Sequence, residues 1–393
     1  MIRTTTHHFT RDINASKMLA YRAFRERAIS ALRWYVDYLW TNRVTWGERV
    51  LDVSAGRYEV PSFISTTEVN CPIEGSARLH KCLSTQACGI VKAVLRKARS
   101  APTKPIVSDT TNLELNSINV DVESSAEFDF WVRLKCLGTE AIHIPLRHHR
   151  HSLKYARLGT RKNSYLLGPN YIDVRWEIPE PTNKSRRLPI GADQGLKTVL
   201  TLSNGASTDQ SPHPHGWTLE KVVSRLAAKR KGSKGFRRSQ GLRANFINWS
   251  INQLNLSKYK TINLEDVRYL RYRKATSRKL SHWTYTLIKR KIERDCEAAG
   301  VQLNYNSSIF RSQRCSSCGL VKKSQRTAKV YACICGFTAD ADINAACNHA
   351  VTLPPLPRDF LNQRPNLKGF YWNTKGIRPL DRKFTVSDAN KSI

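Results

Sequence analysis

Hydrophobic side chains recur at helical spacing in two segments near the start of the chain. In residues 15–42 neither glycine nor proline interrupts the pattern, which is carried by Leu19, Ile29, Leu32, Val36 and Leu39. Residues 75–100 form the second segment, which ends in the basic sequence VKAVLRKARS. We therefore predict two long helices.

The hydrophobic period changes to two between about residues 113 and 180. In FDFWVRLKCLG and YIDVRWEIPEP, apolar and polar positions alternate, which predicts strands of a half-buried antiparallel sheet or barrel. The outward positions of the first strand are Trp131, Arg133 and Lys135. This face suits stacking on bases and pairing with phosphate, but an ordinary solvated face has the same composition.

The polar, proline-flanked segment PEPTNKSRRLP at 179–189 predicts a domain boundary. After it, the apolar runs of IGADQGLKTVLTLSNG predict a hairpin with Asp193 on its first strand. A basic helical region follows, and then the strand KTINLEDV, which ends at Glu265 and Asp266, and a helix at about 281–299. Residues 351–393 hold five prolines and no clear period, so we expect a low-order tail in which LKGFYW is a candidate docking patch.

The charge balance points to a polyanionic partner. Sixty-five Lys and Arg face 31 Asp and Glu, a formal net charge of +34, and nucleic acid is the expected neutralising partner. A basic membrane-surface protein would need an amphipathic helix with a wholly apolar face or a lipidation signal, and neither stands out. No apolar run indicates a signal peptide or membrane span, so we expect a cytoplasmic, nucleoid-associated protein with no membrane partner.

Four of the ten cysteines cluster as Cys315-x2-Cys318 and Cys333-x-Cys335, around a basic loop. Four thiolates suit tetrahedral Zn2+, which would stabilise a small module with little core. The second pair is one residue shorter than a standard zinc knuckle. Free buried thiols, or a ligand set that uses Cys347 or His349, remain open alternatives.

Three carboxylates lie at places where elements are expected to begin or end: Asp193, Glu265 and Asp342. If they converge, their oxygens suit Mg2+ ions that activate water and stabilise the leaving oxygen of a phosphodiester. Spacing alone is weak support for this, because Asp342 could merely cap the helix INAACNHA.

The ordered motifs GADQGLK, INLEDV and RSQRCSSCG…YACICGFTADADINAA resemble the RuvC-like core of the TnpB (OrfB) family and of the compact type V CRISPR effectors. The resemblance covers about residues 190–350. It implies an α/β core with the RNase H fold, a zinc ribbon inserted at about 308–338, and metal binding by Asp193, Glu265 and Asp342. Departures from the family pattern are Gln194, Ala341 and the shortened second cysteine pair.

For residues 1–189 the resemblance implies a β-barrel wedge domain with a helical recognition domain inserted at about 15–112. A guide RNA and a double-stranded DNA target with a short flanking motif are then the expected partners of a monomer or homodimer. The implied function is an RNA-guided DNA endonuclease. A cleavage-inactive RNA-guided binder and a guide-independent RuvC-class nuclease are the alternatives.

Nine residues are predicted to contact nucleic acid because they are basic or aromatic and lie in basic surroundings. They are Trp131, Arg133, Lys135, Arg147, Arg150, Lys231, Arg237, Arg238 and Arg311.

Overall fold

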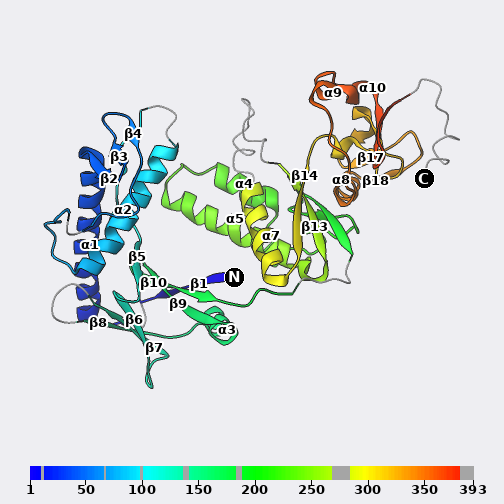
Figure 1. The fold of residues 1–393 in the computed structure, drawn as a ribbon. Coiled ribbons are helices and arrows are strands. Elements are labelled where there is room, and N and C mark those ends of the chain that lie inside the picture. The colour runs from blue at the N-terminus through cyan, green and yellow to red at the C-terminus, as the bar shows by residue number, and fades with distance from the viewer. Residues whose placement is uncertain are drawn as a thin grey trace. The chain divides into compact units, whose positions relative to one another are not determined.

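The computed structural model describes residues 1–9, 13–65, 68–97, 101–135, 141–182, 188–267 and 284–380. The chain divides into two compact units, Met1–Pro179 and Glu180–Ile393 (Figure 1). The division falls at the start of the segment 179–189, where the sequence predicts a boundary. We describe each unit by itself.

The strands of the first unit form two larger sheets. The first has the order β1 (Ile2–His8), β10 (Tyr171–Glu177), β9 (Thr160–Leu167) and β5 (Leu113–Asn116), and the second contains β6 (Val120–Ser124), β7 (Phe130–Leu134) and β8 (Ile142–Leu146). All pairings within them are antiparallel. Among the described residues both sheets are open, so their hydrogen bonding does not close the predicted barrel. The sequence did not predict α3 (Arg150–Leu158), whose N-cap is His149.

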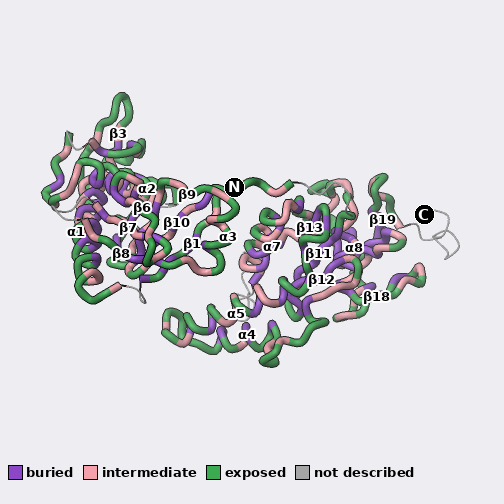
Figure 2. The backbone as a smooth tube through the Cα atoms, turned by 90° about the horizontal axis from the view of Figure 1, so that it is seen from below, coloured by how far each residue is buried: buried purple, intermediate pink, exposed green. Residues whose placement is uncertain are grey.

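The two long helices of the first unit lie between β1 and β5 in the chain, where the sequence predicts them. They are α1 (Ala15–Thr41) and α2 (Ala77–Lys97), separated by the small sheet of β2 (Val44–Trp46), β3 (Arg49–Asp52) and β4 (Arg57–Tyr58). The side chain of Asn14 caps α1 by accepting from Lys17 N at 2.9 Å. The apolar faces of these helices and of the strands pack into one hydrophobic core, whose residues are among those coloured purple in Figure 2. Leu19, although part of the apolar pattern that predicts this helix, is 69% exposed and lies outside the buried face of α1.

The second unit is built on a mixed sheet with the order β12, β11, β13, β14. Here β11 (Pro189–Asp193) is antiparallel to β12 (Thr201–Leu202) and parallel to β13 (Thr261–Asp266), and β13 is parallel to β14 (Gln302–Ser307). Helices α4 (Leu219–Ala227), α5 (Lys234–Asn252) and α7 (Tyr285–Ala299) contribute to the core of this sheet. Another helix, α8 (Ala341–Ala350), contacts β11. The predicted hairpin and α/β organisation are therefore present, whereas residues 281–283 of the predicted helix lie outside the described part of the chain.

Short elements surround the cysteine cluster. They are the strands β15 (Leu320–Val321), β16 (Arg326–Thr327), β17 (Val330–Ala332) and β18 (Thr338–Asp340), with the 3-10 turn η4 (Lys323–Gln325) between β15 and β16. Two further 3-10 turns, η1 (Leu256–Lys258) and η3 (Arg311–Gln313), come earlier in the chain. Strands β16, β17 and β18 form an antiparallel sheet that leads directly into α8. We call residues 314–340 the ribbon.

The prediction of a low-order C-terminal tail is wrong for residues 351–380. This stretch contains α9 (Arg358–Asn362), α10 (Pro365–Lys368), β19 (Phe370–Asn373) and β20 (Gly376–Pro379), and β19 pairs with β15 of the ribbon. Trp372 N donates to Gly319 O at 2.9 Å, and the Phe370 ring lies 4.9 Å from that of Phe360. Burial of aromatic side chains stabilises this segment, although its sequence has neither helical nor strand periodicity. Residues 381–393 lie outside the described residues.

Within the described part of the chain, no helix combines the length and apolar content that crossing a membrane requires.

Candidate metal centres and nucleic-acid contacts

Two of the three predicted carboxylates lie side by side at one edge of the mixed sheet. The parallel register pairs Ala192 with Leu264, so Asp193 and Glu265 follow on adjacent strands. Gly191 explains the close approach of α8 to this edge, because a Cβ at that position would lie 2.0 Å from Ala346 O. Any larger residue would push α8 away from the carboxylates.

Asp193, Glu265 and His349 form a candidate metal centre, since one ligand atom from each lies within 4.8 Å of the others. Asp193 is 7% exposed and His349 is 1% exposed. Burial, followed by the charge of Asp342, raises the pKa of Asp193 to about 7, and burial with the Asp193 charge raises the pKa of Glu265 well above its ordinary value. Burial lowers the pKa of His349 to about 3. When both carboxylates are ionised, they repel each other in this buried site. A divalent cation bound between them would offset that repulsion.

Asp342 lies beside this centre, but its carboxylate is turned toward the ribbon. It accepts from Arg326 Nη2 at 3.2 Å and forms an ion pair with Lys329 Nζ. The helix cap is Asp340, whose Oδ1 accepts from Asp342 N at 2.9 Å. The alternative that Asp342 merely caps α8 is therefore wrong. Sequence reasoning missed Arg326 and Lys329, although the basic loop between the cysteine pairs was a visible signal.

The four predicted cysteines converge. Cys315 Sγ lies 3.8 Å from Cys335 Sγ, and Cys318 Sγ lies 3.6 Å from Cys333 Sγ. A tetrahedral Zn2+ with Zn–S bonds of about 2.3 Å places its sulfurs about 3.8 Å apart, so the donor set fits this ion. The short second spacer is accommodated by a turn at Gly336, whose φ is +89°. Cys347 and His349 are not part of this cluster.

Two buried asparagines of α8 attach the ribbon to the carboxylate centre. Asn344 Oδ1 accepts from Ser316 N at 2.9 Å, and its Nδ2 donates to Arg314 O at 2.8 Å. Asn348 Nδ2 also donates to Arg314 O, at 2.7 Å. The Asp-x-Asn sequence thus combines a carboxylate that lies beside the site and pairs with Arg326 and Lys329 with an amide that fixes the ribbon. The i, i+4 spacing of the asparagines was the available signal for this second role.

The outward face of β7 is partly neutralised by neighbouring acids. Arg133 Nη2 and Lys135 Nζ lie 3.2 Å and 2.9 Å from Asp121 Oδ2, and Arg133 Nε lies 3.3 Å from Glu123 Oε1. Trp131 Nε1 donates to Ser125 Oγ at 3.0 Å. These contacts favour the solvated-face interpretation over a binding surface.

Five other predicted contacts are exposed, and they gather in two places. Arg147 and Arg150 flank the start of α3, whereas Lys231, Arg237 and Arg238 lie in the turn before α5 and in its first turns. Ser233 caps α5 by accepting from Phe236 N at 3.1 Å, which holds this basic turn at the surface. We call Lys231, Arg237 and Arg238 the α5 basic cluster.

Part of the second unit matches a known domain family. Residues 285–349 match the Cas12f1-like TNB domain family. The resemblance to TnpB proteins and compact type V effectors is confirmed. The matched segment runs from α7 through the ribbon to the end of α8, so it includes the four cysteines, Asp342 and His349.

Two curated relatives and one solved structure extend the comparison. The CRISPR-associated endodeoxyribonuclease Cas12f1 of Sulfoacidibacillus thermotolerans is 38% identical over 93 residues, and a provisionally named RNA-guided DNA endonuclease of Streptomyces pristinaespiralis is 27% identical over 176 residues. These matches cover 23% and 40% of this chain, and the chain spans 22% and 44% of the two relatives. A Cas12f1–sgRNA–target DNA complex has a similar fold at 12% identity, with a TM-score of 0.56, covering 89% of this chain and 99% of that one.

Arg311 lies inside the segment that resembles the effectors, but it is not a surface contact. It is 4% exposed, and its guanidinium donates to the carbonyl oxygens of Ser307 and Val351, each at 3.0 Å. A further bond reaches Asn348 O. The prediction that Arg311 contacts nucleic acid is wrong, because the side chain joins the end of β14 to the end of α8.

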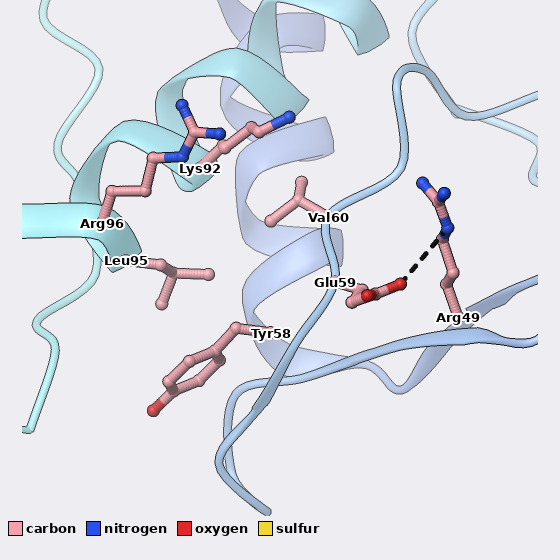
Figure 3. A pocket seen from close by; sticks show the side chains of 7 residues that line it. All are labelled: Arg49, Tyr58, Glu59, Val60, Lys92, Leu95 and Arg96. Carbon is pink, nitrogen blue, oxygen red and sulfur yellow. Dashed lines mark ion pairs between the residues drawn. The ribbon is translucent and has the colours of Figure 1, made fainter.

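A basic pocket in the first unit escaped the sequence analysis. Its volume is about 420 Å³, and its lining, shown in Figure 3, consists of Arg49, Tyr58, Glu59, Val60, Lys92, Leu95 and Arg96. Lys92 and Arg96 extend from α2, whereas the 44% exposed Tyr58 comes from β4. Because these residues come from distant parts of the chain, only folding brings them together around one pocket.

Proposed function

We propose that this protein is an RNA-guided DNA endonuclease with a RuvC-like core of the RNase H fold and an inserted zinc ribbon. The observation that carries the proposal is the convergence of Asp193 and Glu265 on adjacent strand ends, with Asp342 beside them on the helix that follows the ribbon. The names of both curated relatives and the effector fold of the structural match support it.

In this proposal Asp193, Glu265 and Asp342 hold Mg2+, and Cys315, Cys318, Cys333 and Cys335 hold Zn2+. Bound Mg2+ supplies activation of a water molecule and stabilisation of the leaving oxygen, giving a 5′-phosphate and a 3′-hydroxyl. Burial raises the pKa of both Asp193 and Glu265, so a bound divalent cation would be needed to favour their ionised forms. Arg326 and Lys329, which pair with Asp342, are placed to neutralise phosphate oxygens that approach the same edge.

The first unit would serve as the wedge and recognition lobe that holds the guide RNA and its heteroduplex. Its two-sheet and two-helix organisation, with helices inserted after β1, supports this role. Target sequence would be read by base pairing, and the protein would read only a short motif in the flanking duplex. The nuclease domain would extend beyond residue 350 to include the β19–β20 hairpin, which pairs with the ribbon.

Neither alternative function gains support from a particular contact. The convergence of the cysteine sulfurs removes the altered ribbon as a reason to expect an inactive binder. Gln194, the other reason, donates from Nε2 to Glu265 O at 3.0 Å and so helps to hold a carboxylate strand in place. A guide-independent nuclease would leave the basic first unit without a role.

Purified full-length protein with its native co-transcribed RNA is expected to cut a plasmid that carries the matching target in Mg2+. Omission of RNA, or a target mismatched to the guide, should leave the plasmid intact, because base pairing exposes the single strand. Gel analysis of the products measures this. Binding without cutting would replace the proposal with the inactive binder, and RNA-independent cutting of branched DNA would replace it with the guide-independent nuclease.

Replacing Arg237 and Arg238 together with glutamine is expected to weaken binding to the guide RNA and to flatten its salt dependence. For every phosphate that the variant no longer neutralises, the slope of log K against log [salt] should fall by about 0.7 to 0.9. The matched control is Arg133→Gln, since Asp121 and Glu123 already pair with that side chain. Equal slopes for the double variant and the wild type would exclude the α5 basic cluster from the interface.

A further inference from the structure

His349 is an unusual component of the carboxylate centre. It lies on α8 seven residues after Asp342 and is 1% exposed, and its Nε2 is 3.8 Å from Asp193 Oδ1. The backbone of the same residue is held by Asn306 Nδ2, which donates to His349 O at 2.7 Å. The backbone of His349 is therefore held in place, and its imidazole points toward the carboxylates.

Hydrogen bonding does not account for this position. The 3.8 Å separation from Asp193 is longer than an N–H···O hydrogen bond, for which about 2.7 to 3.2 Å is usual. Among the described residues, Nδ1 has no hydrogen-bond partner although it is buried. A buried polar ring without hydrogen-bond partners is costly and calls for another interaction.

A shared metal ion satisfies the geometry. Imidazole nitrogen and carboxylate oxygen bind such ions at about 2.0 to 2.2 Å, so two ligands of one ion lie no more than about 4.4 Å apart. The Nε2 to Oδ1 separation of 3.8 Å falls within this limit, and Glu265 offers a third oxygen within 4.8 Å of both. Nitrogen ligands favour divalent transition ions over Mg2+, which prefers oxygen.

We propose that His349 Nε2 is a ligand of the metal ion held by Asp193 and Glu265, and that it biases this site toward divalent transition ions such as Mn2+ over Mg2+. The inference rests on the proposed metal-binding role of the two carboxylates. The competing interpretation is that His349 only fills space beneath them as a positioning residue.

Pulsed electron paramagnetic resonance of Mn2+ bound to the full-length, zinc-replete, RNA-free protein separates the two. We expect the echo modulation of a directly bound 14N nucleus in the wild type, replaced by that of 15N after [15N]histidine labelling. His349→Leu should abolish the modulation and raise the Mn2+ dissociation constant at least about tenfold, with a smaller change for Mg2+. His151→Gln is the matched control and should retain both properties.

Each outcome decides a different point. If Mn2+ binds and Asp193→Asn removes it, but the wild type shows no histidine nitrogen, His349 is not a ligand and the carboxylate centre stands. If Asp193→Asn leaves Mn2+ binding unchanged, both the carboxylate centre and the role of His349 fail. Should His349→Leu not fold, the isotope substitution in the wild type and the variant His349→Gln still decide the ligand.

Discussion

Asp193→Asn is expected to reduce target DNA cleavage by about a thousandfold while leaving guide RNA binding unchanged. The carboxylate lies centrally, beside Glu265, His349 and Asp342, so its loss removes both a metal ligand and the local negative charge. Metal-assisted stabilisation of the transition state contributes several kcal/mol, and about 4 kcal/mol corresponds to this factor. Single-turnover cleavage of a matched target measures it.

The same substitution should also separate stability from activity. Because burial and the Asp342 charge raise the pKa of Asp193, its ionised form is unfavourable in the folded protein without metal. Asparagine removes that repulsion, so the metal-free variant should melt at the same temperature as the wild type or higher, and divalent ions should no longer stabilise it. Asp266→Asn, which alters the next residue of β13, is the control expected to keep cleavage. Full cleavage by Asp193→Asn would refute the proposed centre.

Cys333→Ser is expected to reduce bound zinc from about one ion per chain to nearly none and to unfold the ribbon. The ribbon has a small core, in which Cys315, Leu320, Tyr331 and Cys333 pack together with Tyr371 of β19. Without metal this cluster cannot offset the chain entropy of its loops. Metal analysis and limited proteolysis within residues 314–340 measure the two effects.

Unfolding of the ribbon should also destabilise the two elements that it contacts, α8 and the C-terminal hairpin. Asn344 and Asn348 bond the first cysteine turn to α8, and β15 pairs with β19 of the C-terminal hairpin. Cleavage should therefore fall together with zinc content. Cys347→Ser is the control, because its thiol donates to Ser203 O at 3.4 Å and lies outside the cysteine cluster. Well-folded wild-type protein without zinc would contradict the ligand set.

Local patterns in the sequence predicted the elements that hold the site. The Gly-x-Asp and Leu-Glu-Asp segments are apolar runs that end in carboxylates, and strands of this kind place their last residues at a common sheet edge. Cysteine spacing predicted the sulfur cluster, because a short turn holds each pair together and the basic loop between the pairs lets them meet. Each inference needed only a local sequence pattern and one contact between two segments, either two strands or two cysteine pairs.

Side-chain partners from distant parts of the chain were not predictable. Arg311 has the composition of a nucleic-acid contact, but its guanidinium bonds to Val351 O, forty residues away. Phe370 and Trp372 lie in a proline-containing segment without a period, and they become ordered only against the ribbon and residues before it. The charge or aromaticity of a side chain does not by itself determine whether it contacts a partner or packs inside the protein.

The sequence by itself determined the basic character of the protein, its main helices and strands, its cluster of four cysteines and its resemblance to compact effectors. The tertiary structure decided that Asp342 faces Arg326 and Lys329, and that His349 joins Asp193 and Glu265. The reason is physical. Periodicity and spacing act over a few residues, whereas a buried centre is set by how closely α8 can approach β11, which the absence of a side chain at Gly191 permits.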